Sequence, residues 1–259
     1  MKKKEIGNYI VNWLRNYSDQ SKTNGFVIGV SGGIDSAVTS TLCALTGKKV
    51  IVLNLPILQH KFEFDRSTEH INWLKQNFKN VESETVELTD VFKGFEKDFP
   101  KSIQDHLTMA NVRSRMRMIT LYAFASHHKL LVAGTGNKVE DFGIGFFTKY
   151  GDGGVDVSAI ADLTKTEVYT LGEELKIVAS IQNAKPTDGL YADNRTDEDQ
   201  IGATYPELEW AMDYLHHKQN FTLSEREKEV LEIFQSRNNA NKHKMEAIPV
   251  CIIPKELKN

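Results

Sequence analysis

The stretch FVIGVSGGIDSAV, residues 26–38, places groups that can bind phosphate directly after a run of apolar residues. Ser31 and Ser36 offer hydroxyls, Asp35 offers a carboxylate, and the glycine pair bares backbone N–H groups. Where a buried strand ends in such a turn and the chain then enters a helix, these N–H groups and the helix dipole attract an anion. The stretch has neither the Walker A pattern nor GxGxxG spacing, so a phosphate site and a purely structural turn are both open at this point.

The hydrophobic pattern around this turn alternates between strands and helices. Short apolar or alternating runs predict strands at 25–30, 48–56, 81–88 and 129–135, and helical spacing predicts helices at 1–17, 36–45, 65–78, 103–128, 164–177, 206–217 and 224–238. Because parallel neighbours need crossover connections, this order predicts an α/β fold, a doubly wound parallel sheet with helices on both faces. The chain shows no internal repeat and no linker, so we expect a single domain over residues 1–259.

The composition excludes several classes of protein. The 259 residues are 40% hydrophobic and carry a net charge of −3, which gives neither a nucleic-acid footprint nor a polybasic membrane signal. Cys43 and Cys251 are the only cysteines, so no disulfide framework and no cysteine-built zinc site is predicted. The N-terminal segment is typical of an amphipathic helix rather than a signal peptide, and no run reaches the ~18 apolar residues of a membrane span. We expect a cytoplasmic protein with small-molecule partners.

The sequence SGGIDS after a buried strand resembles the pyrophosphate-binding loop of the N-type ATP pyrophosphatases, which have an adenine nucleotide alpha hydrolase-like fold. Within that superfamily, the motifs NVRSRMRM, GTGNKVE, GFFTKYGDGGVD and DLTKTEVYTLGEEL are similar to those of the NAD synthetase family, from about Gly29 to Lys244. Two of these motifs lie in segment 134–156, which is polar, glycine-rich and too long for a plain connection.

The resemblance implies a ligase reaction. ATP activates the nicotinate carboxylate of deamido-NAD as an acyl adenylate, ammonia displaces AMP, and Mg²⁺ is the cofactor. This chemistry needs positioning and charge neutralisation, so no covalent nucleophile is expected. Relatives that use glutamine carry an additional amidase domain, for which the 259 residues leave no room, so free ammonia is the expected nitrogen donor.

The resemblance also implies contacts to ATP and to magnesium. Asp35 and Glu140 are the implied magnesium ligands, and the alternative for Asp35 is that it only caps a helix beginning at Ser36. Between Glu140 and GFFTKYGDGG the sequence is one residue longer than the family pattern, which leaves Glu140 and Asp141 as alternatives for the second ligand. The implied ATP contacts are Gly29, Val30, Ser31, Gly32, Gly33, Ile34, Asp35, Ser36, Thr135, Lys165 and Thr187.

The contacts implied for deamido-NAD are charged or polar side chains from three further motifs: Arg115, Lys149, Asp156, His243 and Lys244. Arg113, Arg115 and Arg117 occupy alternate positions and cannot share one helix face, so a solvated basic face is the alternative for any one of them. We expect the basic cluster 242–244 to follow the last helix and the apolar residues of 248–253 to anchor the tail; the alternative is a solvated end. Roles within 188–212 stay open.

A homodimer is also implied by the resemblance, in keeping with the frequency of symmetric pairs. The predicted helix 103–128 offers Leu121, Tyr122, Phe124 and Ala125 as an apolar surface, although core burial explains these residues equally well. Superfamily members that make GMP or asparagine do not share FFTKYGDGG, and those that transfer sulfur to tRNA commonly need cysteines and basic surface. A nucleotide sensor that binds ATP without turnover is the competing hypothesis from another class of protein.

Overall fold

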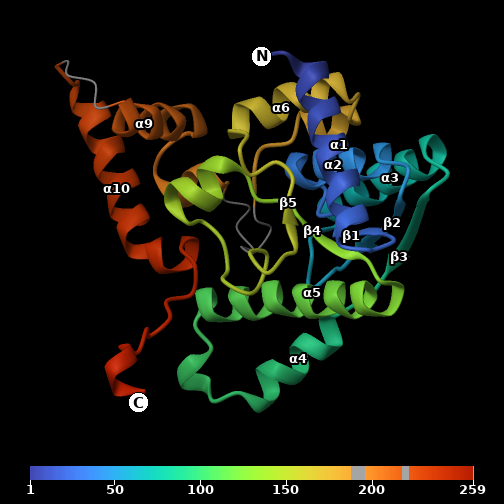
Figure 1. Ribbon diagram of the computed structural model, residues 1–259, viewed down its shortest axis with the longest axis horizontal. Helices are drawn as coiled ribbons and strands as arrows, with labels where there is room; N and C mark the ends of the chain where they lie inside the picture. Colours follow the sequence, from blue (N-terminus) through green and yellow to red (C-terminus); the bar gives the residue numbers. More distant parts are fainter. Residues whose placement is uncertain (188–195, 218–221, 259) are drawn as a thin grey trace.

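The structure is a computed structural model that describes residues 1–187, 196–217 and 222–258. Its strands are β1 (Gly25–Gly29), β2 (Lys49–Asn54), β3 (Val81–Thr85), β4 (Leu131–Gly134) and β5 (Val157–Ser158). They form a five-stranded sheet in the order β3-β2-β1-β4-β5, and each neighbouring pair is parallel. The predicted doubly wound parallel sheet is thereby confirmed (Figure 1).

Helices cover both faces of the sheet (Figure 1). Side chains of β1 alternate between these faces: Phe26 and Ile28 pack with α1, α2 and α6, whereas Val27 packs with α4 and α5. All three side chains are fully buried, as expected for the central strand of a covered sheet. The α-helices are α1 (Lys3–Gln20), α2 (Ile34–Leu45), α3 (Lys61–Asn77), α4 (Thr89–Asp98), α5 (His106–His128), α6 (Lys165–Glu174), α7 (Ala179–Gln182), α8 (Asp197–Ile201), α9 (Tyr205–His217) and α10 (Glu225–Met245).

Strands β1 and β4 are neighbours at the point where the strand order reverses. After β1 the chain crosses to β2 on one side, and after β4 it continues to β5 on the other. A crevice opens beyond the carboxyl ends of two such strands, and ligands of α/β sheets bind there. Segments 31–36 and 135–140 follow β1 and β4 directly, so the fold brings two of the predicted ATP motifs to one edge of the sheet.

A separate hydrophobic cluster lies to one side of the sheet, where α9 and α10 pack against a π-helical turn at Val139–Ile144 (Figure 1). Val139, Leu208 and Phe234 contribute buried side chains from the three elements. Because the π-helical turn follows β4, this cluster connects α9 and α10 to the crevice. The last turn of α10 lines a cavity described below, and Tyr205 at the start of α9 contacts Glu140, which lines another.

Three features differ from the sequence prediction. The pattern did not predict the helices α4, α7 and α8, the π-helical turn or the two-residue strand β5. Helix α10 continues to Met245, so the cluster 242–244 lies within its last turn rather than after it. The expected anchoring of the tail is wrong, because Ile248, Val250 and Ile252 are 65%, 73% and 81% exposed.

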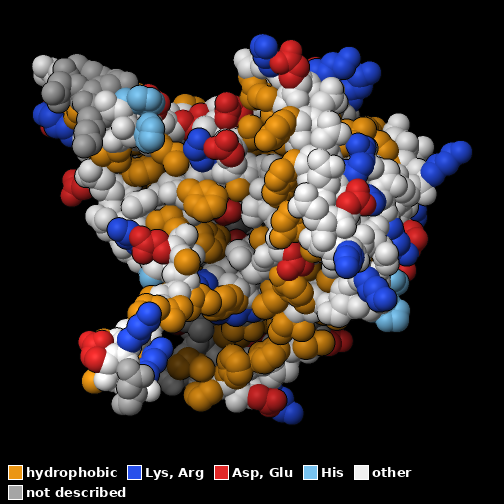
Figure 2. Space-filling model, in the orientation of Figure 1, with side chains coloured by type: hydrophobic (Ala, Val, Ile, Leu, Met, Phe, Trp, Pro, Cys, Tyr) orange, Lys and Arg blue, Asp and Glu red, His pale blue; other side chains and the backbone are white. Residues whose placement is uncertain are grey.

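Hydrophobic side chains gather at the lower part of the face drawn in Figure 2, where Figure 1 places α4 and α5. Ile119 on α5 is exposed, as is Val91 on α4. The four residues that the sequence analysis considered as a dimer surface belong to the core instead. Ala125 is buried, and Leu121, Tyr122 and Phe124 pack against the core. Of the helices described, none combines the length and the hydrophobicity that a membrane crossing needs.

Candidate active site

The turn after β1 is held by hydrogen bonds between its own hydroxyls and backbone. Ser36 Oγ donates to the Gly33 carbonyl at 3.0 Å and accepts from the Ser31 N–H at 3.2 Å. Ser31 Oγ lies 3.1 Å from Ser36 Oγ and accepts from the Gly33 N–H at 3.2 Å. The two serines therefore hold the predicted phosphate loop in one conformation.

Gly32 lies where the turn approaches α3 most closely. Its φ is +88°, and a Cβ at this position would lie 2.7 Å from the Glu63 carbonyl oxygen and 3.1 Å from the Ser67 nitrogen. Ser67 Oγ donates to the Val30 carbonyl at 2.8 Å, and Arg66 Nε donates to the Gly32 carbonyl at 3.3 Å. Helix α3 therefore supports the loop from behind, and only glycine fits the closest point.

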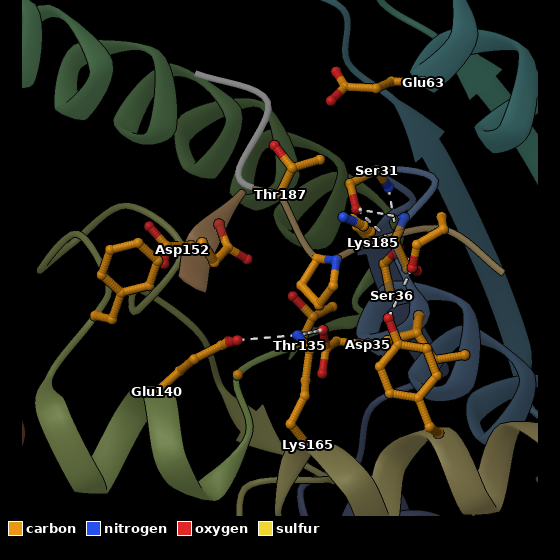
Figure 3. Close-up of a pocket in the computed structure, with 18 of the residues that line it drawn as sticks. Ser31, Asp35, Ser36, Glu63, Thr135, Glu140, Asp152, Lys165, Lys185 and Thr187 are labelled. Carbon is orange, nitrogen blue, oxygen red and sulfur yellow. Dashed lines mark hydrogen bonds and ion pairs between the residues drawn. The ribbon is translucent and has the colours of Figure 1, made fainter. Parts of the chain in front are cut away.

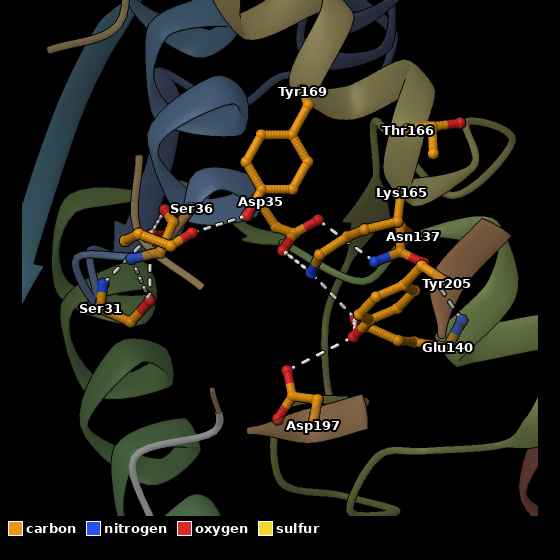
Figure 4. Close-up of polar contacts among 12 residues, drawn as sticks. Ser31, Asp35, Ser36, Asn137, Glu140, Lys165, Thr166, Tyr169, Asp197 and Tyr205 are labelled. Atoms are coloured by element: carbon orange, nitrogen blue, oxygen red, sulfur yellow. Dashed lines mark hydrogen bonds and ion pairs between the residues drawn. The ribbon is translucent and has the colours of Figure 1, made fainter. Parts of the chain in front are cut away.

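An ammonium group joins the two carboxylates that the sequence analysis assigned to magnesium (Figure 4). Lys165 Nζ donates to Asp35 Oδ2 at 2.5 Å and to Glu140 Oε1 at 3.0 Å. Asn137 Nδ2 donates to Asp35 Oδ1 at 3.2 Å, and Tyr205 Oη donates to Glu140 Oε1 at 2.5 Å. The network thus connects α2, the π-helical turn, α6 and α9.

Asp35 is not a helix cap. Helix α2 begins at Ile34, one residue before it, and the Asp35 carboxylate bonds Lys165 and Asn137 instead of the helix N–H groups. The alternative of a simple cap for a helix beginning at Ser36 is therefore wrong.

The charges of this network control one another's protonation. Burial lowers the pKa of Lys165, but Asp35 and Glu140 outweigh burial and raise it, so the ammonium stays charged. Burial raises the pKa of Asp35 despite the attraction of Lys165. For Glu140, burial is outweighed by the charge of Lys165 and the hydrogen bond from Tyr205, and the pKa is lowered. One cation thus holds together two carboxylates that otherwise repel each other.

The extra residue before GFFTKYGDGG coincides with the π-helical turn Val139–Ile144, a turn that holds one residue more than an α-helical turn. Glu140 shares an ammonium with Asp35, whereas Asp141 lies against Gly136, where a Cβ would come within 2.0 Å of an Asp141 carboxylate oxygen. Burial and the neighbouring carboxylates raise the pKa of Asp141 to about 8. Of the two alternatives for the second ligand, the geometry favours Glu140.

A cavity of about 180 Å³ opens between the loop and this network. Figure 3 shows Ser31 and Ser36 on one side of it and Glu140 and Asp152 on the other. Among the predicted ATP contacts, Gly29 and Val30 line the neighbouring cavity instead, and Gly32 lies against α3 and lines neither cavity. The predicted ATP contacts that line the smaller cavity are Ser31, Gly33, Ile34, Asp35, Ser36, Thr135, Lys165 and Thr187.

The neighbouring cavity is larger, about 860 Å³, which lies within the range of roughly 300–1,000 Å³ typical of ligand pockets. Four of the five predicted deamido-NAD contacts line it, namely Arg115, Lys149, His243 and Lys244, together with the cations Arg117 and Arg237. The two cavities adjoin, because both are lined by Ser31, Ser36, Gln59, Glu63, Thr135, Phe146, Asp152 and Thr187.

Helix α5 fixes the loop that forms the boundary between the cavities. Ser114 Oγ donates to Asp152 Oδ1 at 2.7 Å and accepts from the Asp152 N–H at 2.9 Å. The Thr148 N–H donates to the same carboxylate oxygen at 3.0 Å, and Thr148 Oγ1 donates to Asn111 Oδ1 at 2.6 Å. Asp152 is therefore held at the boundary by α5 and by its own loop.

The end of α10 closes the other side of the larger cavity. Lys244 Nζ donates to the Gly145 carbonyl at 2.5 Å and to the Phe147 carbonyl at 2.7 Å. Lys149 Nζ donates to the His243 carbonyl at 2.8 Å. The structure thus brings Lys149, His243 and Lys244 together, and the Lys244 ammonium holds the loop 145–147. Their contacts to deamido-NAD stay predictions.

Asp156 lies apart from the other predicted deamido-NAD contacts. Its carboxylate accepts from Tyr122 Oη at 3.0 Å and from the Val132 N–H at 2.8 Å, so it joins α5 to β4 at the sheet. Neither cavity is lined by Asp156 within the described ranges of the chain. Its assignment to deamido-NAD stays a prediction.

The three arginines of NVRSRMRM point in different directions. Arg113 stacks its guanidinium over Phe92 at 5.6 Å, and Arg117 Nε donates to the Leu55 carbonyl at 3.0 Å. Arg115 is exposed, and its Nε donates to the Lys149 carbonyl at 3.3 Å. Burial lowers the pKa of Arg117 to about 10. A solvated position is therefore wrong for Arg113 and Arg117, whereas Arg115 is exposed and its contact to deamido-NAD stays a prediction. Arg117 is a cavity-lining cation that the sequence analysis did not assign.

Two further residues of the site were not predicted. Tyr205 is 3% exposed and bonds Glu140, and Glu63 is 4% exposed and lines both cavities. In the sequence, Glu63 belongs to a charged helical stretch and Tyr205 precedes a proline at a helix start, so neither has a local signal of function. Only the three-dimensional contacts identify them.

Comparison with known proteins agrees with this arrangement. A sequence profile described as NAD synthase matches residues 6–248. An NH(3)-dependent NAD(+) synthetase of Mycoplasma genitalium is 39% identical over 201 residues, covering 76% of this chain and 78% of that protein. Another, of Syntrophomonas wolfei subsp. wolfei, is 32% identical over an alignment of 265 positions that covers 100% of both chains. Among solved structures, NMN synthetase from Francisella tularensis has a TM-score of 0.84 at 32% identity and covers 98% of this chain and 99% of its own.

The profile match extends over the loop after β1, the π-helical turn and the last turn of α10 alike, so it concerns the whole site and not the sheet alone. With that extent and that identity, the chain belongs to the NAD synthase family.

Proposed function

We propose that this chain is an ammonia-dependent NAD synthetase, a ligase that carries out the final step of NAD biosynthesis. It adenylates the nicotinate carboxylate of deamido-NAD with ATP and amidates the adenylate with ammonia, and the products are NAD, AMP and pyrophosphate. The observation that carries this proposal is the shared boundary of two unlike cavities. One is built on the loop after β1, and the other is lined by cations.

The boundary is where the two reactants have to meet. ATP in the smaller cavity places its phosphates at the N–H groups of the loop and at Lys165, and a dinucleotide in the larger cavity places its own phosphates among Arg115, Arg117 and Lys149. The α-phosphate and the nicotinate carboxylate then face each other beside Thr135 and Asp152. Holding both in one geometry supplies much of the rate enhancement without a covalent nucleophile.

The residues of the smaller cavity fit magnesium. Six carboxyl side chains and three cationic side chains line it within the described ranges, so a triphosphate bound there needs an additional cation. No group of three or more described His, Cys, Asp or Glu side chains is arranged to hold a metal alone, which agrees with Mg²⁺ bound by one or two carboxylates plus substrate phosphates. Asp35 and Glu140 would hold it. When bound, the ion neutralises charge on the pyrophosphate that leaves.

Lys165 has a distinct task in this proposal. Its side chain is 5% exposed and its ammonium stays charged, so it remains a fixed positive group beside the ATP phosphates. A preorganised charge in an enclosed cavity stabilises developing negative charge more than a solvated one does. Lys165 also keeps Asp35 and Glu140 at a fixed separation.

The test is a product assay. Purified protein is incubated with ATP, Mg²⁺, deamido-NAD and ammonium, and NAD and AMP are measured by chromatography. Equal amounts of NAD and AMP support the proposal, and ATP binding without AMP formation supports the nucleotide sensor instead. Replacing ammonium by glutamine tests the donor, since the proposal expects little NAD from glutamine.

A second candidate substrate comes from the solved structure of NMN synthetase, which is 32% identical to this chain over nearly all of both chains. The same chemistry on the deamido form of NMN requires only the nicotinate half of the larger cavity. Competition in one vessel separates the two substrates: the ratio of NAD to NMN formed from equal amounts of deamido-NAD and deamido-NMN gives the ratio of their kcat/KM values.

The proposal includes a homodimer in the cytoplasm. The exposed apolar side chains on α4 and α5, such as Val91 and Ile119, support a second copy as the group that covers this face. Sedimentation at assay concentration tests the dimer, and fractionation of cells that express a tagged chain tests the location.

A further inference from the structure

Tyr205 is the first residue of α9, and its hydroxyl donates a hydrogen bond to a carboxylate of the π-helical turn. Its Oη donates to Glu140 Oε1 at 2.5 Å, and it lies 3.3 Å from Asp197 Oδ2. The side chain is 3% exposed, and the ammonium of Lys165 lies 4.8 Å from the centre of its ring. Figure 4 shows the Tyr205 side chain beside that of Glu140.

Tyr205 is a neutral donor, which distinguishes it from Lys165. A phenol hydroxyl is uncharged at neutral pH, and this one donates to Glu140 Oε1. A hydroxyl fixes the direction of the Glu140 carboxylate and leaves the negative charge available to a cation, whereas the ammonium of Lys165 offsets that charge. The two donors to Glu140 Oε1 therefore have different consequences for cation binding.

Helix α9 holds the Lys165 side of the network as well. One helical turn after Tyr205, the Glu209 carboxylate accepts from the Thr166 N–H at 2.9 Å and from Thr166 Oγ1 at 2.6 Å. Thr166 follows Lys165 at the start of α6, where backbone N–H groups lack helical partners. Two side chains on successive turns of α9 thus fasten the segment that carries Glu140 and the segment that carries Lys165.

We propose that Tyr205 is a positioning residue for the cation and ATP site: its hydroxyl aims the Glu140 carboxylate, and Glu209 on the same helix fixes the start of α6 relative to it. This inference rests on the proposed use of Glu140 as a ligand. Groups that hold a ligating carboxylate are commonly worth about 10–100-fold in metal affinity or activity.

The test compares Tyr205→Phe with Tyr169→Phe. Each variant loses one phenol hydroxyl, but the Tyr205 hydroxyl donates to the Glu140 carboxylate, whereas Tyr169 Oη donates to the Ala184 carbonyl at 3.0 Å. Phenylalanine at 205 keeps the ring beside the ammonium of Lys165. Three quantities are measured: the Kd of ATP with Mn²⁺ by calorimetry, the Mg²⁺ concentration for half-maximal rate, and the KM of deamido-NAD.

For Tyr205→Phe we expect both the Kd of ATP with Mn²⁺ and the Mg²⁺ requirement to rise by about tenfold, with an unchanged KM for deamido-NAD. Tyr169→Phe should leave the Mg²⁺ requirement as in the parent. Glu209→Ala should also raise the Kd of ATP with Mn²⁺, because it removes the hydrogen bonds that hold Thr166 at the start of α6. Equal Mg²⁺ requirements in the two tyrosine variants would overturn the inference.

Failure of the proposed function is distinguishable from failure of this inference. If the parent protein forms no NAD, the ligase assignment fails, while calorimetry with ATP and Mn²⁺ still compares the two variants without any turnover. If the parent is active and both variants bind ATP with Mn²⁺ as it does, the ligase assignment stands and Tyr205 has no positioning role.

Discussion

Lys165 and Asp35 are 130 positions apart in the sequence, yet the ammonium of one lies 2.5 Å from the carboxylate of the other. Their side chains are only 5% and 16% exposed, so water does not screen the pair as it does at the surface. Glu140 shares the same ammonium at 3.0 Å. Removal of the cation therefore leaves two buried carboxylates facing each other.

Lys165→Ala is expected to lower the free energy of unfolding by about 3–5 kcal/mol, the usual cost of breaking a buried charge pair. Urea unfolding in EDTA measures it. The matched control is Lys138→Ala, which removes a 2.9 Å pair with Asp162 whose side chains are 39% and 97% exposed. That pair is worth less than about 1 kcal/mol. A similar loss in both variants would contradict the enclosure of Lys165.

Gly32→Ala is expected to disrupt the phosphate loop, whereas Gly33→Ala is tolerated. At Gly32 the φ of +88° costs a side chain about 1–2 kcal/mol, and the Cβ would also meet the backbone of α3. At Gly33 the backbone is extended, with φ −96° and ψ 162°, and the nearest atom to a Cβ is Ser31 Oγ at 3.4 Å. Calorimetric titration with ATP should show weakened binding in Gly32→Ala alone. Equally strong binding by both variants would exclude the close approach to α3.

His70 makes stability depend on pH. It is fully buried, its Nε2 lies 3.1 Å from Ser40 Oγ, and burial lowers its pKa to about 4. The His70 side chain binds a proton near pH 6.5 in the unfolded chain but not in the folded one. The contribution of neutral His70 to the free energy of unfolding is therefore complete above pH 6.5 and is lost as the pH falls toward 4. Between pH 7.5 and 5.5 the loss amounts to about 1.4 kcal/mol.

The measurement is urea unfolding of the parent and of His70→Gln at these two pH values. From pH 7.5 to pH 5.5, the free energy of unfolding of the parent should fall by about 1.4 kcal/mol more than that of His70→Gln. This difference does not depend on how far the substitution itself destabilises the protein at pH 7.5. His127→Gln, at an exposed position of α5, should behave like the parent. An identical pH dependence in the parent and His70→Gln would show that His70 is not the source.

Lys244→Ala is expected to raise the KM for deamido-NAD several-fold and to leave the KM for ATP unchanged. Its ammonium holds the carbonyls of Gly145 and Phe147 at the wall of the larger cavity, away from the Asp35 network. His243→Ala should have a smaller effect, because the contact from Lys149 goes to the His243 carbonyl, which alanine keeps. Steady-state kinetics with each substrate varied in turn measures both. Parallel changes in the two KM values would argue against a separate dinucleotide wall.

The sheet and the phosphate loop could be predicted because their signals are local. A buried run followed by SGGIDS places Ser31 and Asp35 at the end of a strand whatever the rest of the chain does, and the alternation of elements predicts a parallel sheet. Lys165 needed the family motif as well, since a lysine at a helix start is ordinarily exposed. The motif implied a contact to ATP, and the structure adds a feature that the sequence analysis did not predict, since Lys165 joins Asp35 and Glu140.

The remaining features depend on contacts between elements that no local pattern encodes. Tyr205 has its role only because α9 packs against the π-helical turn, and that turn arises from a single extra residue. The tail was expected to pack because it is apolar, yet apolar composition does not specify a partner surface, and Ile252 is exposed. The end of α10 was misplaced because residues 239–245 contain no strong apolar periodicity.

The shared ammonium also has a consequence for synthesis on the ribosome. Translation produces Asp35 and Glu140 before Lys165, and Lys165 before Tyr205. A nascent chain that ends between 140 and 165 contains both carboxylates and the strands that bring them together, but lacks the cation that pairs them. Their repulsion opposes early docking of β4 beside β1, so the nucleotide-binding edge of the sheet becomes favourable only when α6 has emerged.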